Sequence, residues 1–229
     1  MRAYYEYAGI TIYHGDWHAC ESVLQPKYDL LLTDPPYGIG ASRAKAFGWG
    51  DNRGTNGLGG YNPGRRDYGD SAWDDYRPSD AEMISILSLG GDAIIWGGNY
   101  FNLGPCKGPL VWDKLRGDTD FADGEMAWNT LNRALRIFRY RWNGFLVDQH
   151  SKDNRVHPTQ KPLALMKWCL GFVPNAKTVI DPFMGSGTTL EACKTLGLNA
   201  TGIEIEERYC EIAAKRLSQE VFNFDEATA

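Results

Sequence analysis

The sequence predicts an α/β fold with a mostly parallel sheet and helices on both of its faces. Short apolar runs typical of buried strands recur along the chain, at residues 29–34, 93–96, 110–112, 178–181 and 200–204. Helical patterns separate several of these runs, and strands that alternate with helices favour a parallel sheet. The chain has 229 residues, of which 43% are hydrophobic and 23% charged, so we expect one globular domain over residues 1–229.

The first helix pattern begins at a capping box over residues 79–82, in which two side chains can bind the free amides at a helix start. Met83, Ile84 and Leu87 follow at helical spacing and predict a buried stripe. The glycine pair at 90–91 then predicts the end of this helix.

Two further helices are predicted near the C-terminus. Residues 188–196 form a helical pattern that ends at Gly197, and residues 206–221 repeat apolar side chains along one stripe. Residues 39–78, by contrast, contain many glycines and charges and no periodicity. A loop of that length in a compact domain is usually functional or disordered, so we expect an irregular surface insertion there.

Several classes of protein are disfavoured. No apolar run approaches the roughly 18 residues that a membrane crossing needs, and the first residues lack the apolar core of a secretion signal. The five cysteines are scattered without CxxC spacing, which predicts neither a disulfide framework nor a thiolate zinc site. His14 and His18 stand four apart without a third ligand, so we expect no metal. A cytoplasmic protein with no membrane partner is therefore expected.

Charge is distributed unevenly along the chain. A total of 24 basic and 29 acidic residues argues against a sequence-independent nucleic-acid coat. Residues 131–161 nevertheless contain seven basic and two acidic residues, and residues 38–69 contain five basic and two acidic ones. These two basic segments are suited to face a polyanion. The candidate DNA-phosphate contacts in them are Arg43, Arg65, Arg66, Arg139 and Arg141.

The most informative segment is residues 178–190. A strand pattern ends at Asp181, glycines permit a tight turn, and a helix pattern begins at Thr188. The unpaired amides at a helix start suit an anionic group. Glu204 ends the next strand pattern, where an acid suits the ribose hydroxyls of a nucleotide. The loop is neither Gly-x-Gly-x-x-Gly nor a P-loop, which disfavours hydride transfer and P-loop chemistry.

A second acidic strand end is followed by two prolines, in Asp34-Pro35-Pro36-Tyr37. Proline has no amide hydrogen, so this turn offers acceptors only. Ligands of open α/β sheets bind beyond the carboxyl ends of strands, so we expect Asp34, the Pro35 carbonyl and the Tyr37 ring in the same crevice as the glycine loop. These groups suit a planar base with an exocyclic NH2. The alternative is a plain Pro-Pro turn with Asp34 on the surface.

Together these motifs resemble those of the β-class DNA amino-methyltransferases, whose catalytic motif precedes the S-adenosylmethionine loop, as residues 34–37 precede residues 181–187 here. Residues 155–162 resemble the cofactor-side motif of that family, and Gly15-Asp16 resembles the short motif whose acid contacts the cofactor adenine. Compact phage-type adenine methylases are similar in their Trp-Asp-Lys and Trp-Asn-Gly stretches, found here at residues 112–114 and 142–144.

The resemblance implies a Rossmann-like S-adenosylmethionine-dependent methyltransferase that modifies the N6 amine of adenine in double-stranded DNA, with the target base flipped out of the duplex. Target recognition is expected in residues 39–78 or 113–150, where the resemblance is weakest, and a homodimer and a cognate restriction nuclease stay open as partners. The expected catalytic residues are Asp34, Pro35, Pro36 and Tyr37. The expected cofactor-binding residues are Asp16, Thr159, Lys161, Asp181, Phe183, Gly185, Ser186, Gly187, Thr188 and Glu204.

Other functions stay open at this point. The N4 amine of cytosine needs the same acceptors, although cytosine members of the family more often carry Ser-Pro-Pro-Tyr, so Asp34 favours adenine. A further alternative is a methylase of RNA or of a protein side-chain amide, and the latter typically pairs Asn with Pro-Pro-Tyr. A catalytically silent DNA-binding or cofactor-binding module would be indicated by a degraded Asp34 or Tyr37, and both are intact.

Overall fold

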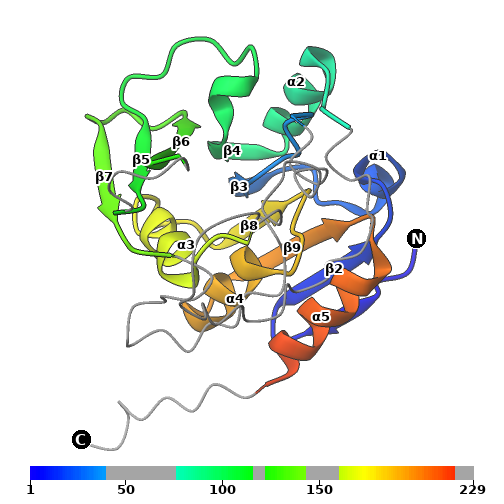
Figure 1. Cartoon of the computed structure of the whole chain (residues 1–229). Coiled ribbons are helices and arrows are strands. Elements are labelled where there is room, and N and C mark those ends of the chain that lie inside the picture. Colours follow the sequence, from blue (N-terminus) through cyan, green and yellow to red (C-terminus); the bar gives the residue numbers. More distant parts are fainter. Residues whose placement is uncertain (40–75, 116–121, 143–159, 220–229) are drawn as a thin grey trace, which may run out of the picture.

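The computed structural model describes residues 1–39, 76–115, 122–142 and 160–219 (Figure 1). In these residues one sheet has the strand order β1-β2-β9-β8-β3-β4-β6-β5-β7. The strands are β1 (Tyr5–Tyr7), β2 (Ile10–His14), β3 (Tyr28–Thr33), β4 (Gly90–Trp96), β5 (Leu110–Asp113), β6 (Gly124–Asn129), β7 (Arg136–Arg139), β8 (Thr178–Asp181) and β9 (Asn199–Glu204). The helices are α1 (Trp17–Cys20), α2 (Asp80–Ser88), α3 (Leu163–Leu170), α4 (Thr188–Thr195) and α5 (Glu207–Ser218), with short 3-10 turns η1 (Glu21–Val23) and η4 (Gly98–Tyr100).

The strand directions confirm the mostly parallel sheet. The neighbours β2, β9, β8, β3 and β4 all run parallel, so their carboxyl ends share one edge of the sheet. Strand β6 is antiparallel to both β4 and β5, and β7 is parallel to β5. The start of β6 therefore lies at the same edge as the ends of β3, β5 and β7. This edge carries the candidate site.

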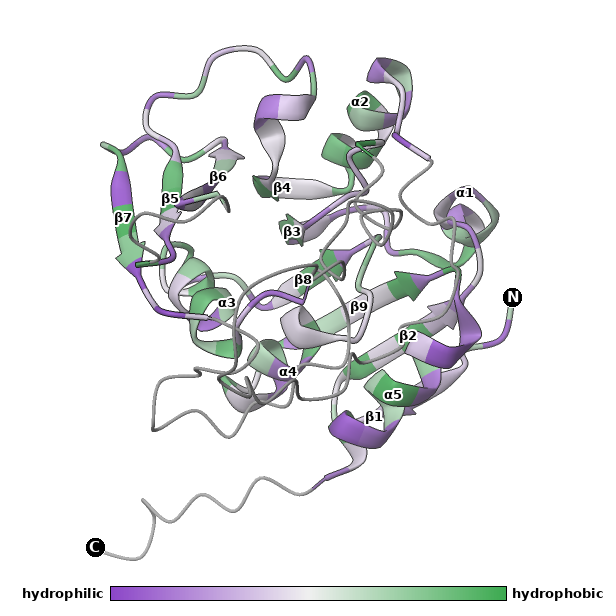
Figure 2. Cartoon of the chain, in the orientation of Figure 1, coloured by the Kyte–Doolittle hydropathy of each residue, from purple (hydrophilic) through white to green (hydrophobic). Residues whose placement is uncertain are grey.

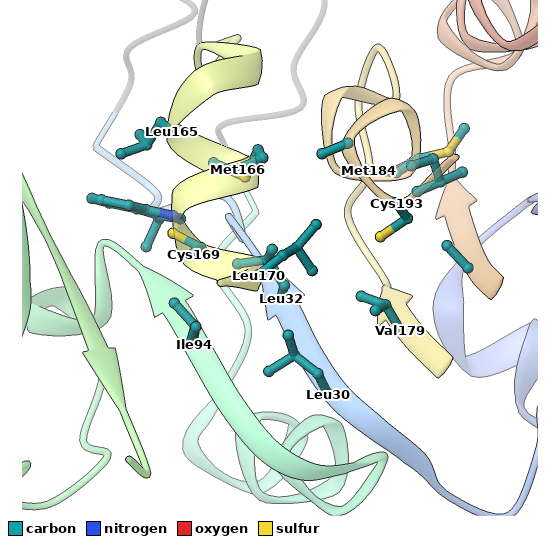
Figure 3. Packing of buried hydrophobic residues seen from close by; sticks show 14 of the residues in the cluster. Leu30, Leu32, Ile94, Leu165, Met166, Cys169, Leu170, Val179, Met184 and Cys193 are labelled. Atoms are coloured by element: carbon teal, nitrogen blue, oxygen red, sulfur yellow. The ribbon is translucent and has the colours of Figure 1, made fainter. Parts of the chain in front are cut away.

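Helices cover both faces of the sheet, as the sequence predicts. Alternate strand residues point to opposite faces, so Leu30 and Leu32 pack with α3, α4 and α5, whereas Leu31 packs with α1 and α2. Figure 3 shows the first of these contacts, with α3 residues such as Met166 and Leu170 above Leu30 and Leu32. Figure 2 shows both hydrophilic and hydrophobic colour on α5 and on β7, as expected of elements with one face toward the core and one toward solvent.

The five predicted strands are present as β3, β4, β5, β8 and β9, and four further strands were not predicted from the sequence. Two of these, β6 and β7, are built from the segment 113–150 that was assigned to target recognition. The short strands β1 and β2 extend the sheet at the other end. Each has polar side chains on one side and is too short to give a clear alternating signal.

The predicted helix over residues 79–89 is confirmed as α2, with both halves of the capping box formed between Ser79 and Glu82. One detail of that prediction is wrong: Ile84 is exposed, and Ile86 takes the buried position beside Met83. The helix ends just before the glycine pair, as predicted, and the two glycines also open β4. A Cβ at Gly90 would lie 2.8 Å from the Leu31 backbone nitrogen of the neighbouring strand, so glycine is favoured there.

The other helix predictions are also confirmed. The pattern at 188–196 is α4, and the one at 206–221 is α5, which ends at Ser218. Most of the expected insertion over residues 39–78 lies outside the described residues, as does the chain after residue 219. Among the helices that the structure describes, none is long and apolar enough to cross a membrane.

Candidate active site

The glycine loop joins β8 to α4 at the carboxyl edge of the sheet. Gly185 and Gly187 have φ angles of 52° and 79°, in the left-handed region that side chains disfavour. A Cβ at Gly187 would also stand 2.8 Å from the Cβ of Ala213 on α5. The loop can therefore turn tightly and pack against α5 only with glycine there. The first amides of α4 follow directly after this loop, and such amides have no partner within their own helix.

Asp181, at the end of β8, supports this loop. Its Oδ1 accepts hydrogen bonds from the Thr33 hydroxyl at 2.7 Å and from the Phe183 amide at 3.2 Å. Burial raises the pKa of Asp181 to about 6, and these hydrogen bonds oppose that rise. Arg216 on α5 holds the other side of the loop, because its guanidinium donates to the Ser186 carbonyl at 2.9 Å. No sequence motif pointed to Arg216.

Glu204, at the end of β9, is held by backbone amides. Its Oε2 accepts from the Gly185 amide at 3.0 Å and its Oε1 from the Glu206 amide at 2.7 Å. Burial raises the pKa of Glu204 to about 7, although both amides favour the charged form. The carboxylate thus bridges the glycine loop and the turn after β9, with lone pairs left for a ligand.

A cavity of about 470 Å³ lies between these strand ends. Trp17, Tyr76, Trp96 and Tyr209 add aromatic surface to it. Gly187 does not line it, since it packs on α5, and Thr159 lies outside the described residues. The residues expected from the sequence that do line it are Asp16, Asp34, Pro36, Lys161, Asp181, Phe183, Gly185, Ser186, Thr188 and Glu204.

A second cavity, of about 630 Å³, lies on the other side of the Asp34 turn. It is lined by Pro35 and Tyr37, together with Tyr100 and residues of β5 and β6. The expectation that Pro35 and Tyr37 share the glycine-loop crevice is therefore wrong. The Tyr37 ring stacks on Tyr100 in the lining of this second cavity, with ring centroids 4.6 Å apart. Asp34 and Pro36 line both cavities.

Both carboxylate oxygens of Asp34 are engaged by side chains. The Tyr37 hydroxyl donates to Oδ1, and the Lys161 ammonium pairs with Oδ2. Lys161 also stands 3.0 Å from Glu125 Oε2, at the start of β6. Sequence reasoning assigned Lys161 to the cofactor and missed Glu125 and Tyr100. No sequence pattern identified them, because an antiparallel strand and a short turn bring them to the site.

The basic segments are only partly described. Arg43, Arg65 and Arg66 lie outside the described residues. Arg139 ends β7, which runs parallel to β5, so it lies at the same edge of the sheet as Asp34. Its side chain is 64% exposed and stands 3.4 Å from Asp113. Arg141 follows two residues later and is exposed.

Comparisons with known proteins agree with this arrangement. A family model described as DNA methylase matches residues 111–215. Type II methyltransferase M.HpaI of Haemophilus parainfluenzae is 40% identical over 85 residues, which are 37% of this chain and 27% of that protein. M2.DpnII of Streptococcus pneumoniae is 41% identical over 80 residues, 34% of this chain and 30% of that protein. The matches thus span less than a third of these two relatives.

A longer match is to M.ScaI of Streptomyces caespitosus, 26% identical over 96% of this chain and 84% of that protein. Among solved structures, the M1.HpyAVI complex with S-adenosylmethionine has a TM-score of 0.53 and 23% identity, covering 91% of this chain and 100% of that one. The cytosine-N4-specific PvuII DNA methyltransferase has a TM-score of 0.55 and 13% identity, covering 95% and 89%. These structures share the fold. The family-model and type II methyltransferase matches make this chain similar to DNA methylases over residues 111–215 and, at lower identity, over most of its length.

Proposed function

We propose that this chain is an S-adenosylmethionine-dependent DNA methyltransferase that methylates the N6 amine of adenine. The observation that carries the proposal is the position of Asp34, whose side chain lines two adjoining cavities. A methyl donor in the first cavity and a base in the second would meet beside its carboxylate. Holding both reactants in this way makes the reaction effectively unimolecular, which is worth roughly 7–11 kcal/mol at best.

The first cavity has the groups that S-adenosylmethionine needs. The Glu204 carboxylate has lone pairs for ribose hydroxyls, and Asp16 lies beside it on the cavity wall. Trp17 and Phe183 offer apolar surface for a planar adenine. The bound molecule would supply an electrophilic sulfonium methyl group. Here the glycine loop allows close approach of the backbone, and Asp181 keeps the loop in place.

The second cavity suits the base. Tyr37 and Tyr100 offer aromatic surface, and Asp34 and the Pro35 carbonyl are acceptors at the cavity wall. An amine of adenine is a poor nucleophile because its lone pair is delocalised into the ring. Acceptors that draw its hydrogens localise the lone pair on nitrogen. With S-adenosylmethionine bound in the first cavity, its methyl group would pass from sulfur to this nitrogen, and Asp34 or water would take the proton that the amine loses.

The position of the basic residues supports DNA as the substrate. Arg139 and Arg141 lie at or just beyond the same edge of the sheet as Asp34 and carry exposed side chains. DNA that approaches this edge would place its phosphates near them and its flipped base near Asp34. We keep residues 1–229 as a single methyltransferase domain and residues 39–78 and 113–150 as the candidate recognition segments, with sequence choice expected to follow them.

The test is to incubate the purified protein with double-stranded DNA and S-adenosylmethionine and to analyse the nucleosides by mass spectrometry. We expect N6-methyladenine, and none with an Asp34→Ala variant that remains folded. Detection of N4-methylcytosine would support a DNA methyltransferase but would show that its target base is cytosine rather than adenine. A folded protein that binds S-adenosylmethionine and DNA and yields neither product would contradict the proposal and leave a silent binding module.

A further inference from the structure

Lys161 is placed to act on Asp34. It lies just before α3, its side chain is 7% exposed, and its ammonium pairs with Asp34 Oδ2. The same ammonium stands 3.0 Å from Glu125 Oε2. Burial of a lysine is costly unless it is paired, and here two carboxylates pair with it. The pairing fixes the ammonium between the first cavity and the start of β6.

Glu125 is held in turn by a second lysine. Lys114, which is 9% exposed, donates to Glu125 Oε1, and its ammonium lies 5.0 Å from the Trp112 ring. The register of β5 and β6 brings the pair together, because Trp112 is the partner of Glu125 across the two strands. The cluster thus alternates in charge, from Asp34 through Lys161 and Glu125 to Lys114.

This alternation bears on the protonation of Asp34. The pKa of Asp34 is raised overall, chiefly by burial; Glu125 adds to the rise, and Lys161 opposes it and limits it. Burial lowers the pKa of Lys161, but its two carboxylate partners outweigh this and hold the pKa well above its usual range, so it stays charged. Burial also raises the pKa of Glu125, yet the two lysines bring it to about 2.

The remaining titratable groups around Asp34 are Tyr37 and Asp181. Tyr37 donates its hydroxyl to Asp34 Oδ1, and burial and the Asp34 charge raise its pKa far above its usual range, so it stays a donor. Asp181 lies across the first cavity, with a pKa of about 6 that Asp34 helps to raise. Among the described residues, Lys161 is therefore the positively charged side chain that contacts Asp34.

We propose that Lys161 is a positioning residue that keeps Asp34 as a charged acceptor for the substrate amine, and that Glu125 and Lys114 hold the Lys161 ammonium in place. This deepens the proposed function and rests on it. Lys161 then acts through Asp34, which differs from the cofactor contact expected from the sequence. Each Asp34 oxygen carries two lone pairs, so the amine can still donate to it while Lys161 and Tyr37 remain bound.

The experiment compares the pH dependence of kcat in Lys161→Met, Lys161→Arg and Glu125→Gln. The matched control is Lys215→Met, which removes an exposed lysine from α5. In Lys161→Met we expect kcat at neutral pH to fall at least about tenfold, its acidic limb to move to higher pH, and the KM for S-adenosylmethionine to change less than about threefold. Lys161→Arg keeps the charge and should restore most of the rate. Glu125→Gln should move the limb to lower pH.

A readout independent of activity follows the Asp34 carboxyl by carbon-13 NMR in aspartate-labelled protein, with its signal assigned by its loss in Asp34→Asn. The Asp34 titration midpoint should rise in Lys161→Met and not in Lys215→Met. An unchanged midpoint, or an S-adenosylmethionine affinity weakened tenfold with an unmoved acidic limb, would overturn the inference. If Lys161→Met does not fold, Lys161→Arg and Glu125→Gln carry the same test. If the parent transfers no methyl group yet the midpoint moves, the proposed function fails and the Lys161–Asp34 coupling stands.

Discussion

Two acidic strand ends at the same edge of the sheet are held in different ways. Glu204, at the end of β9, accepts hydrogen bonds from the backbone amides of Gly185 and Glu206. Asp34, just after β3, is held by the side chains of Tyr37 and Lys161. Backbone amides are fixed once the loop has folded, whereas side chains can rotate. The comparison suggests that Glu204 belongs to a rigid binding wall and that Asp34 sits in a set of groups that substitution can retune.

The groups that stabilise the charged form also differ between the two acids: backbone amides at Glu204 and a lysine ammonium at Asp34. Amide dipoles offset only part of the cost of burying Glu204, so its pKa remains raised to about 7. Burial also raises the pKa of Asp34, although a full ammonium charge opposes that rise. A pKa of about 7 means that the charge of Glu204 should change near neutral pH.

The largest expected effect concerns Asp34. We expect Asp34→Ala to lower the methyl-transfer rate by at least about 10²–10³, because its acceptor role is stronger in the transition state than in the ground state. DNA binding and cofactor affinity should be largely kept. Rate and both affinities are to be measured on one preparation, with Glu211→Ala on the surface of α5 as a control. A rate within about tenfold of the parent's would make Asp34 structural.

The sequence predicted the strand and the helix on either side of the glycine loop. The strand, glycine turn and helix around Asp181 and the acid at Glu204 follow each other closely in the chain, so residue order indicates their geometry. Sequence reasoning failed where the contact is distant. Lys161 reaches Asp34 across 127 positions, and Glu125 arrives on a strand that the alternation of its residues did not predict. Such pairing depends on strand register, which sequence patterns do not specify here.

The second expected effect concerns the other acid. Glu204→Ala should weaken S-adenosylmethionine binding by roughly ten- to a hundredfold, since removing a hydrogen bond to a charged group costs about 1.5–3 kcal/mol. DNA affinity should not change, because the side chain lines the first cavity only. Titration calorimetry measures both. An unchanged cofactor affinity would remove Glu204 from the binding wall.

A third prediction uses the pKa of Glu204, about 7. If the charged form accepts the ribose hydroxyls, S-adenosylmethionine should bind roughly tenfold more tightly at pH 8 than at pH 6. Because the folded pKa is raised, Glu204 contributes stability below about pH 4.5 that is lost as the pH rises through about 7.

The measurement is calorimetry at both pH values on the parent and on Glu204→Gln. The variant cannot ionise at this position, so its binding should lose that pH dependence. Asp181, with a pKa of about 6, titrates in both proteins. Any pH dependence of binding that remains in Glu204→Gln can therefore be assigned to groups other than Glu204. A parent whose affinity is the same at pH 6 and pH 8 would contradict the assignment of the charged form as the ligand.

The smallest expected effect lies at the rim, where neither acid is involved. Arg139→Gln and Arg141→Gln should each weaken DNA binding on all sequences and lower the slope of log affinity against log salt by about 0.9 per lost phosphate contact. The Arg139 side chain is 64% exposed and stands 3.4 Å from Asp113, so its loss should cost little folding stability. Cofactor affinity should stay the same. Filter binding over a salt series measures the slopes, with Lys215→Gln as a control for charge alone. The same series on Arg65→Gln and Arg66→Gln tests the other basic segment. If the slopes of all four arginine variants equal the parent's, DNA approaches another face, and the shared edge of Asp34 and Arg139 reflects only the direction of their strands.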